Sequence, residues 1–216
     1  MISAINVSGG STPVQLLVLV SLVSILPGAL LAMTGFTRIL IVLGFVRNAM
    51  GTPSVPPNQV LVGIAFFLAL FVMSPTLKTV NDVAIAPYRA GHLSQTEALQ
   101  RGLEPIRTFM FKQTRGSDLS LFIGLAHGGQ PRTRADVPTQ VLIPAFILSE
   151  LKTAFQIGFL IYLPFLIIDL IVATTLTSMG MMMLPPALIS LPFKILLFVL
   201  VDGWHLVVQS LMSSFH

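Results

Sequence analysis

Long runs without a charged side chain constrain this chain more than any other feature of its sequence. Val14–Met33 and Gln59–Leu77 carry no charge, and Val141–Val201 carries four charges in 61 residues. About 20 apolar residues in a helix cross the roughly 30 Å hydrocarbon core of a bilayer. A backbone in hydrocarbon must satisfy its own hydrogen bonds, and a helix does so within one segment. The sequence therefore predicts an all-α, polytopic membrane protein built from helical hairpins.

Prolines interrupt these apolar runs and predict broken helices. Proline removes a backbone donor and its ring clashes with the preceding turn, so it kinks or ends a helix. We expect a kink at Pro27-Gly28 and a pair of helices broken near Pro164. A tight turn is expected at Met181–Pro186, followed by one last helix over Leu188–Leu211.

The middle of the chain has a different composition. Only 9% of all residues are charged, 20 in total, yet 13 of these charged residues lie between Lys78 and Asp136. Ser94 and Glu97 have the spacing of a capping box, which predicts the start of a helix. We therefore divide the chain into apolar helices with a basic, proline-rich loop (1–77), a small charged helical domain (78–140) and apolar helices with a methionine loop (141–216).

Basic residues between the first two apolar runs predict the orientation. Arg38 and Arg47 lie there with no acidic residue beside them. Short cytoplasmic loops carry an excess of Lys and Arg, so this loop is expected in the cytoplasm. The middle domain would then lie in the periplasm, and the chain in the inner membrane. Met1–Thr12 lacks the basic start of a secretory signal, so either the numbering begins near a mature end or the first run is an uncleaved signal.

No catalytic or metal-binding pattern stands out. The chain has no glycine-rich phosphate loop, no cysteine and only a thin, scattered excess of basic residues, +4 overall. We therefore expect no enzyme activity, cofactor, metal or nucleic-acid partner. The methionines of the 179–183 stretch could suggest copper(I), but adjacent residues point in different directions on a helix and packing is favoured. The histidines lie far apart in the sequence: His92, His127, His205 and His216.

Ionisable residues in the C-terminal apolar runs need partners. Glu150 and Lys152 are two apart, so on a helix they face opposite sides. Lys194 and Asp202 share a face but lie about 12 Å apart along the axis. Ion pairs with another helix or another subunit would stabilise these charges, together with Asp169. The alternatives are a proton relay of Glu150 and Asp169, or charged heads that reach the membrane surface.

Several long motifs, in a fixed order, resemble the FliP family of type III secretion export-gate proteins. The resemblance begins at about residue 13 and covers nearly the whole chain from there. The motifs are Gly35–Leu40, Val46–Pro53, Pro56–Val60, Phe71–Pro75, Pro144–Phe159, Pro164–Leu170, Gly180–Pro186 and Leu191–Trp204.

The resemblance implies a subunit without catalysis. It implies a homo-oligomer, with a pentamer expected, that joins FliQ, FliR and other flagellar export proteins of the basal body, in a gate lifted largely out of the bilayer plane. Unfolded flagellar subunits would pass through its channel. It further implies a methionine gasket at Met181, Met182 and Met183, and subunit contacts at Glu150 and Lys194. Phe109 and Phe122 are expected at contacts of the middle domain, with an ordinary monomer core as the alternative.

Two other functions remain open at this stage. The homologous gate subunit of a virulence injectisome is the close alternative, although Thr52-Pro53 and Pro185-Pro186 resemble the flagellar branch more. A secondary solute transporter would also have broken helices and charges at the membrane midplane. It would be expected to show an inverted repeat between its halves, and the sequence shows none.

Overall fold

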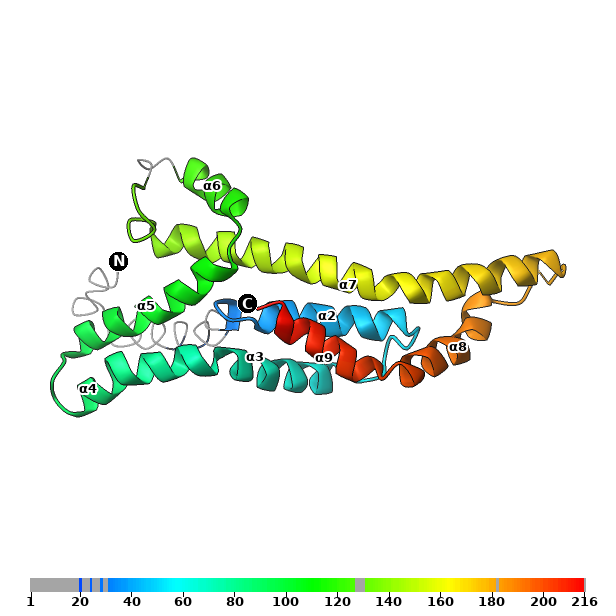
Figure 1. Ribbon diagram of the computed structural model, residues 1–216, viewed down its shortest axis with the longest axis horizontal. Coiled ribbons are helices and arrows are strands. Elements are labelled where there is room, and N and C mark those ends of the chain that lie inside the picture. The colour runs from blue at the N-terminus through cyan, green and yellow to red at the C-terminus, as the bar shows by residue number, and fades with distance from the viewer. Residues whose placement is uncertain are drawn as a thin grey trace.

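Helices make up the part of the chain that the structure describes. This computed structural model describes residues 20, 24, 28, 31–126, 131–181 and 183–215, which leaves out most of the predicted Val14–Met33 span and its expected kink. Figure 1 shows an elongated molecule, and the all-α prediction is confirmed for these residues. The helices are α2 (Phe36–Ala49), α3 (Asn58–Val80), the π-helix η3 (Asn81–Ile85), α4 (Ala86–Arg89), α5 (Gln95–Gln113), α6 (Gly116–Leu125), α7 (Thr139–Ser178), α8 (Pro186–Leu200) and α9 (Gly203–Ser213).

The helix α2 is a correction to the sequence-based expectation. The segment was predicted as part of a polar connection, but it forms a helix near the centre of the molecule (Figure 1). Its apolar residues repeat every three or four positions, which places Ile39, Val42, Leu43 and Val46 on one buried face. Arg38 lies on the same buried face, so it is not a free loop charge that the positive-inside rule could count.

The second apolar run forms a longer helix than predicted. α3, η3 and α4 continue one another over Asn58–Arg89, for 32 residues. The chain reverses at Gly91, whose φ of 77° suits glycine, and returns as α5. The predicted capping box is confirmed: the Ser94 hydroxyl accepts from the Glu97 backbone N–H, and the Glu97 carboxylate accepts from the Ser94 N–H at 2.9 Å.

The helix α7 continues through both of its prolines. It spans 40 residues, so the predicted break near Pro164 is wrong. Pro164 removes only one hydrogen bond, and the remaining bonds of an apolar helix have no water to compete with them. Gly158 lets α7 approach α2 closely, because a Cβ there would lie 2.5 Å from Cδ2 of Phe45.

The last predicted helix is in fact two helices. α8 and α9 meet at 64°, with Asp202 in the left-handed conformation (φ 50°, ψ 56°) between them. Local hydropathy does not reveal this bend, because both arms are apolar. α9 then lies against α2, where Val207 and Leu211 join the same core cluster as Ile39 and Val42.

Candidate functional site

A buried ion pair joins α2 to α7 at the centre of the molecule. The Arg38 side chain is 2% exposed and that of Glu150 is 0% exposed. Arg38 Nε donates to Glu150 Oε2 at 3.0 Å, and Nη2 donates to Oε1. Glu150 was predicted to find its partner on another helix or another subunit. The structure places that partner on another helix of the same chain.

The remaining donors of Arg38 bring two further elements to this pair. Nη1 donates to the backbone oxygen of Ser214 at 2.6 Å and to its hydroxyl at 3.0 Å, and Nη2 donates to Gln113 Oε1 at 3.0 Å. The guanidinium lies over the Phe215 ring, 3.9 Å from its centroid. Gln113 also donates to the Phe215 carbonyl at 3.2 Å. Arg38 thus connects α2, α5, α7 and the segment after α9.

A second polar cluster attaches α6 to α7. Lys152 donates to Oδ1 of the buried Asp118, and Ser149 donates to Oδ2 at 2.7 Å. The Arg115 guanidinium donates to Thr153 Oγ1 at 3.1 Å. Burial by itself would raise the pKa of Asp118, but the hydrogen bonds from Lys152 and Ser149, helped by nearby positive charges, outweigh it. The pKa of this carboxyl is therefore held below its ordinary value.

This cluster predicts a loss of stability in acid. Because the pKa of Asp118 is lowered on folding, its contribution is complete above the ordinary value of about 3.9 and is lost as the pH falls through the folded value. At neutral pH we expect Asp118→Asn to lower the free energy of unfolding by about 1–3 kcal/mol. The measurement is unfolding of both proteins in detergent as the pH falls. A difference in the free energy of unfolding between the two proteins that stays constant into strong acid would contradict this prediction.

The third ion pair joins α8 to α7. Lys194 Nζ donates to Asp169 Oδ2 at 2.6 Å, and Ser190 Oγ donates to Asp169 Oδ1, also at 2.6 Å. The structure thus brings together two of the residues expected to need partners. Asp202 lies at the bend between α8 and α9, exposed, and makes no ion pair with any described residue.

The two phenylalanines of the middle domain lie in or beside a core of this chain. Phe109 is buried and packs edge-on against Phe146 with ring centroids 6.1 Å apart. Phe122 is partly buried against the same cluster. The sequence left two alternatives for these residues, a subunit contact or a monomer core, and this arrangement is that of a monomer core.

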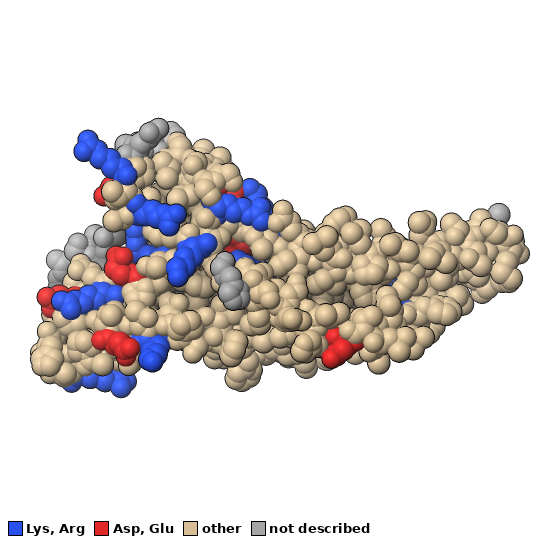
Figure 2. Space-filling model, viewed as in Figure 1, with Lys and Arg blue, Asp and Glu red and all other residues tan. Residues whose placement is uncertain are grey.

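The turn between α7 and α8 contains methionines and lies at the end of the molecule opposite α4–α6 (Figure 1). Met181 and Met183 lie between α7 and α8 with exposed side chains, that of Met183 being 98% exposed. Met182 lies outside the described residues. On the face shown in Figure 2, charged residues gather over the α4–α6 end, whereas the α7–α8 end is nearly free of them.

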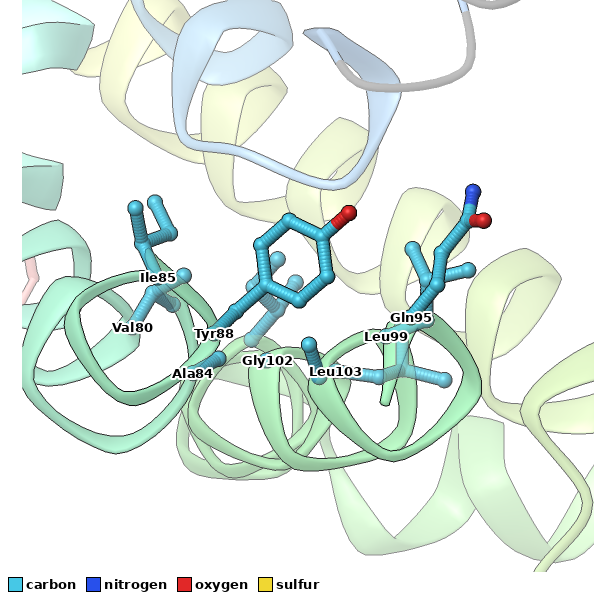
Figure 3. A pocket seen from close by; sticks show the side chains of 10 residues that line it. Val80, Ala84, Ile85, Tyr88, Gln95, Leu99, Gly102 and Leu103 are labelled. Carbon is cyan, nitrogen blue, oxygen red and sulfur yellow. The ribbon is translucent and has the colours of Figure 1, made fainter. Parts of the chain in front are cut away.

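An apolar groove of about 420 Å³ lies between η3–α4 and α5. In Figure 3 the Tyr88 ring lies across it, between Ile85 on one side and Gln95 on the other. The helices approach closely here, since a Cβ on Gly102 would lie 3.4 Å from that of Ala84. The groove is apolar apart from the Tyr88 hydroxyl and the Gln95 amide, so this hairpin leaves apolar surface uncovered.

Sequence reasoning missed Arg38 and Asp118, the partners of Glu150 and Lys152. Arg38 was interpreted as a loop charge, and Asp118 as one of many charges in a polar segment. The periodic apolar residues of 36–49 could have indicated a helix and therefore a buried Arg38. Within the described residues, no three His, Asp or Glu side chains lie close enough to hold a metal ion.

These features define the class of protein. Asn58–Arg89 and Thr139–Ser178 are long and apolar enough to cross a membrane, and α8 with α9 adds a third span if the bent pair counts as one. Within the spanning-length windows only 22% and 11% of residues are buried, so most of their apolar surface faces outward. A soluble protein rarely exposes so large an apolar surface. The chain is an all-α membrane protein with ion pairs between its helices.

Comparison with known sequences gives the family. A profile of the FliP family matches residues 19–211, and the chain belongs to this family. It is 56% identical over 205 residues to the flagellar biosynthetic protein FliP of Bacillus subtilis, covering 95% of this chain and 93% of that protein. The protein of the same name from Pectobacterium carotovorum is 57% identical over 203 residues (94% and 79% covered), and that of Aquifex aeolicus 46% over 204 (94% and 85%). The resemblance found in the sequence motifs is confirmed.

Proposed function

We propose that this chain is a core subunit of the flagellar type III protein-export gate, which forms, with FliQ and FliR, the channel for unfolded flagellar subunits. The observation that carries the proposal is membership of the FliP family, whose similar members are named flagellar biosynthetic proteins. Those names favour the flagellar gate over the injectisome. The role is passage of a polypeptide and needs no catalytic group.

The exposed apolar surface supports a multisubunit assembly. Phe67 and Phe71 on α3, Leu170 on α7 and Leu200 on α8 are all more than half exposed in the isolated chain. Such faces are stable only against lipid or against other apolar helices. We infer a homo-oligomer, a pentamer in this proposal, with further helices from FliQ and FliR. It would belong to the basal body at the inner membrane, with the α4–α6 end on the periplasmic side.

Complementation and mass measurement test this proposal. We expect the chain to restore flagellar secretion to a Bacillus subtilis strain that lacks its own FliP, because the two proteins are 56% identical. The purified protein should be a ring-like homo-oligomer by native mass measurement. A stable monomer that transports a small solute by itself in liposomes would contradict the export-gate role and favour a transporter.

The methionines between α7 and α8 are expected to seal the channel against ions. Methionine is unbranched, flexible and apolar, so a ring of such side chains can close tightly and repack around a passing chain. Apolar constrictions also exclude ions by dewetting. Replacing Met181, Met182 and Met183 by alanine should raise ion leak across the membrane several-fold while assembly is retained. Leak is measured as ion flux in cells or liposomes.

The matched control is Met179→Ala, because Met179 is an exposed methionine of the same turn outside the proposed gasket. It should leave the leak unchanged. If the triple variant assembles, stays tight to ions and secretes normally, the three methionines serve only for packing.

A further inference from the structure

The bend between α8 and α9 has the geometry of a hinge. Asp202 is the one described residue other than glycine with a positive φ. Residues with a side chain rarely adopt this conformation, although aspartate tolerates it better than most. Gly203 must be glycine here, because a Cβ would lie 2.3 Å from the Phe198 ring. The chain therefore changes direction over two residues, and Asp202 alone links the arms: its N–H donates to the Val199 carbonyl at 3.2 Å, and its carbonyl accepts from the Leu206 N–H at 3.2 Å.

The α9 arm is firmly anchored. Val207 and Leu211 are buried in the central cluster. Beyond α9, the Ser214 carbonyl accepts from Arg38, and the Phe215 carbonyl accepts from Gln113. A Cβ on Gly35 would lie 2.5 Å from the Phe215 ring, so this residue is closely packed too. α9 is therefore the fixed side of the bend.

The α8 arm is held near the bend by Phe198, which is buried in the central cluster between Phe165 and Trp204, and beyond it by polar bonds. Its outward residues Leu188, Val199 and Leu200 are exposed. Its polar attachment to α7 is the set of bonds from Lys194 and Ser190 to Asp169, a side chain that is 35% exposed. An open groove of about 460 Å³ lies on the inner side of the bend, with a lining that includes Pro164 and Phe165 of α7. The pivot itself is therefore packed by Phe198, and the described part of the arm beyond it has one polar latch, to Asp169, with an open groove beside it.

We propose that α8 forms an arm that rotates about Asp202-Gly203, with the Lys194–Asp169 ion pair as its latch. α8 has 15 residues, so the arm is about 22 Å long, and a rotation of about 15° moves its far end by about 6 Å. That far end, at Pro186, is joined to the turn between α7 and α8, where Met181 and Met183 are exposed. The consequence for gating rests on the proposed export function, whereas the rotation itself does not.

The rotation is tested by a distance measurement in the purified protein. The chain has no native cysteine, so spin labels can be attached at Leu188→Cys on α8 and Leu206→Cys on α9, both exposed positions. The native latch should give one narrow distance distribution. Adding Lys194→Met should produce a second or clearly broadened population, while Lys194→Arg should keep the narrow one. The same narrow distance in the Met variant, with the protein still monodisperse, would overturn the proposal.

A reversible cross-link tests whether export requires the arm to move. Thr175 on α7 and Ile189 on α8 line one groove between these helices, and neither takes part in the Lys194–Asp169 ion pair. A double cysteine variant at these positions, bridged by a short disulfide-forming reagent, should lose secretion and recover it on reduction. Each single cysteine variant, treated identically, should secrete throughout. Undiminished secretion by the bridged protein would show that the arm does not need to move for export. The spin-label distances do not depend on secretion. They therefore test the hinge even if the proposed export role proves wrong.

Discussion

Replacing Glu150 by alanine is expected to lower the free energy of unfolding by about 3–5 kcal/mol. The substitution leaves the Arg38 guanidinium without its carboxylate in a site where both side chains are almost completely enclosed. An unpaired buried charge is far more costly than a missing surface ion pair. Most proteins have only about 5–15 kcal/mol of stability in total. Thermal or denaturant unfolding in detergent measures the change.

A matched pair whose carboxylate is exposed separates burial from charge. Glu104 also faces an arginine, Arg107, at 3.8 Å, but its side chain is 73% exposed. Glu104→Ala is therefore expected to change stability by less than about 1 kcal/mol. Replacing Arg38 and Glu150 together by Met and Leu should lose less than Glu150→Ala alone, since no charge is left unpaired. If Glu150→Ala unfolds like the native protein, water must reach this site and the pair contributes little.

This result would also change how an assembly defect is interpreted. From the sequence, loss of Glu150 was expected to weaken contacts between subunits. The structure pairs Glu150 within its own chain, so a variant that fails to assemble should first show reduced stability of the single chain. Comparing oligomer yield with unfolding midpoints across several variants distinguishes the two causes.

Replacing Gly158 by alanine is expected to lower the free energy of unfolding by about 1–3 kcal/mol. A Cβ at this position would lie 2.5 Å from Cδ2 and 3.1 Å from Cβ of Phe45. The base of the Phe45 side chain cannot swing away, so α2 and α7 would have to separate along their shared interface. Phe45→Leu in the same chain should recover part of the loss. Unfolding of the single and double variants measures this coupling.

Gly44 offers a control on α2 itself. Nothing lies within 4 Å of a Cβ built on Gly44. Gly44→Ala should therefore leave stability unchanged or raise it by up to about 1 kcal/mol, because alanine favours a helix interior. The two glycine substitutions are expected to act in opposite directions. Equal effects at both positions would mean that helix propensity, and not the close approach of α2 and α7, decides the result.

The three ion pairs of α7 have a common arrangement. Each joins α7 to a different helix: Glu150 to α2, Lys152 to α6 and Asp169 to α8. Apolar packing between helices is not directional, whereas an ion pair with hydrogen bonds stabilises one register. In an apolar bundle these pairs therefore specify which part of each helix meets α7.

The local sequence was sufficient for those features that depend on neighbouring residues. Runs of apolar residues predicted the long helices, because hydropathy and helix length are properties of one segment. The capping box at Ser94 and Glu97 was predicted for the same reason, since its partners lie three positions apart. The motifs that place the chain in its family are also local.

Other features depended on contacts between distant parts of the chain. Arg38 and Glu150 are 112 positions apart, and only the packing of α2 against α7 makes them partners. The continuity of α7 through Pro164 and the bend at Asp202 also differ from the local prediction. A proline can either interrupt a helix or lie within one, and Asp202-Gly203 can either continue a helix or bend it. The sequence by itself determined the long apolar helices and the capped helix of the middle domain, although the helix α2 was missed. Only the tertiary structure decided which charges meet and where the helices bend, because those choices depend on the free energy of packing between segments and not on the propensity of any one segment.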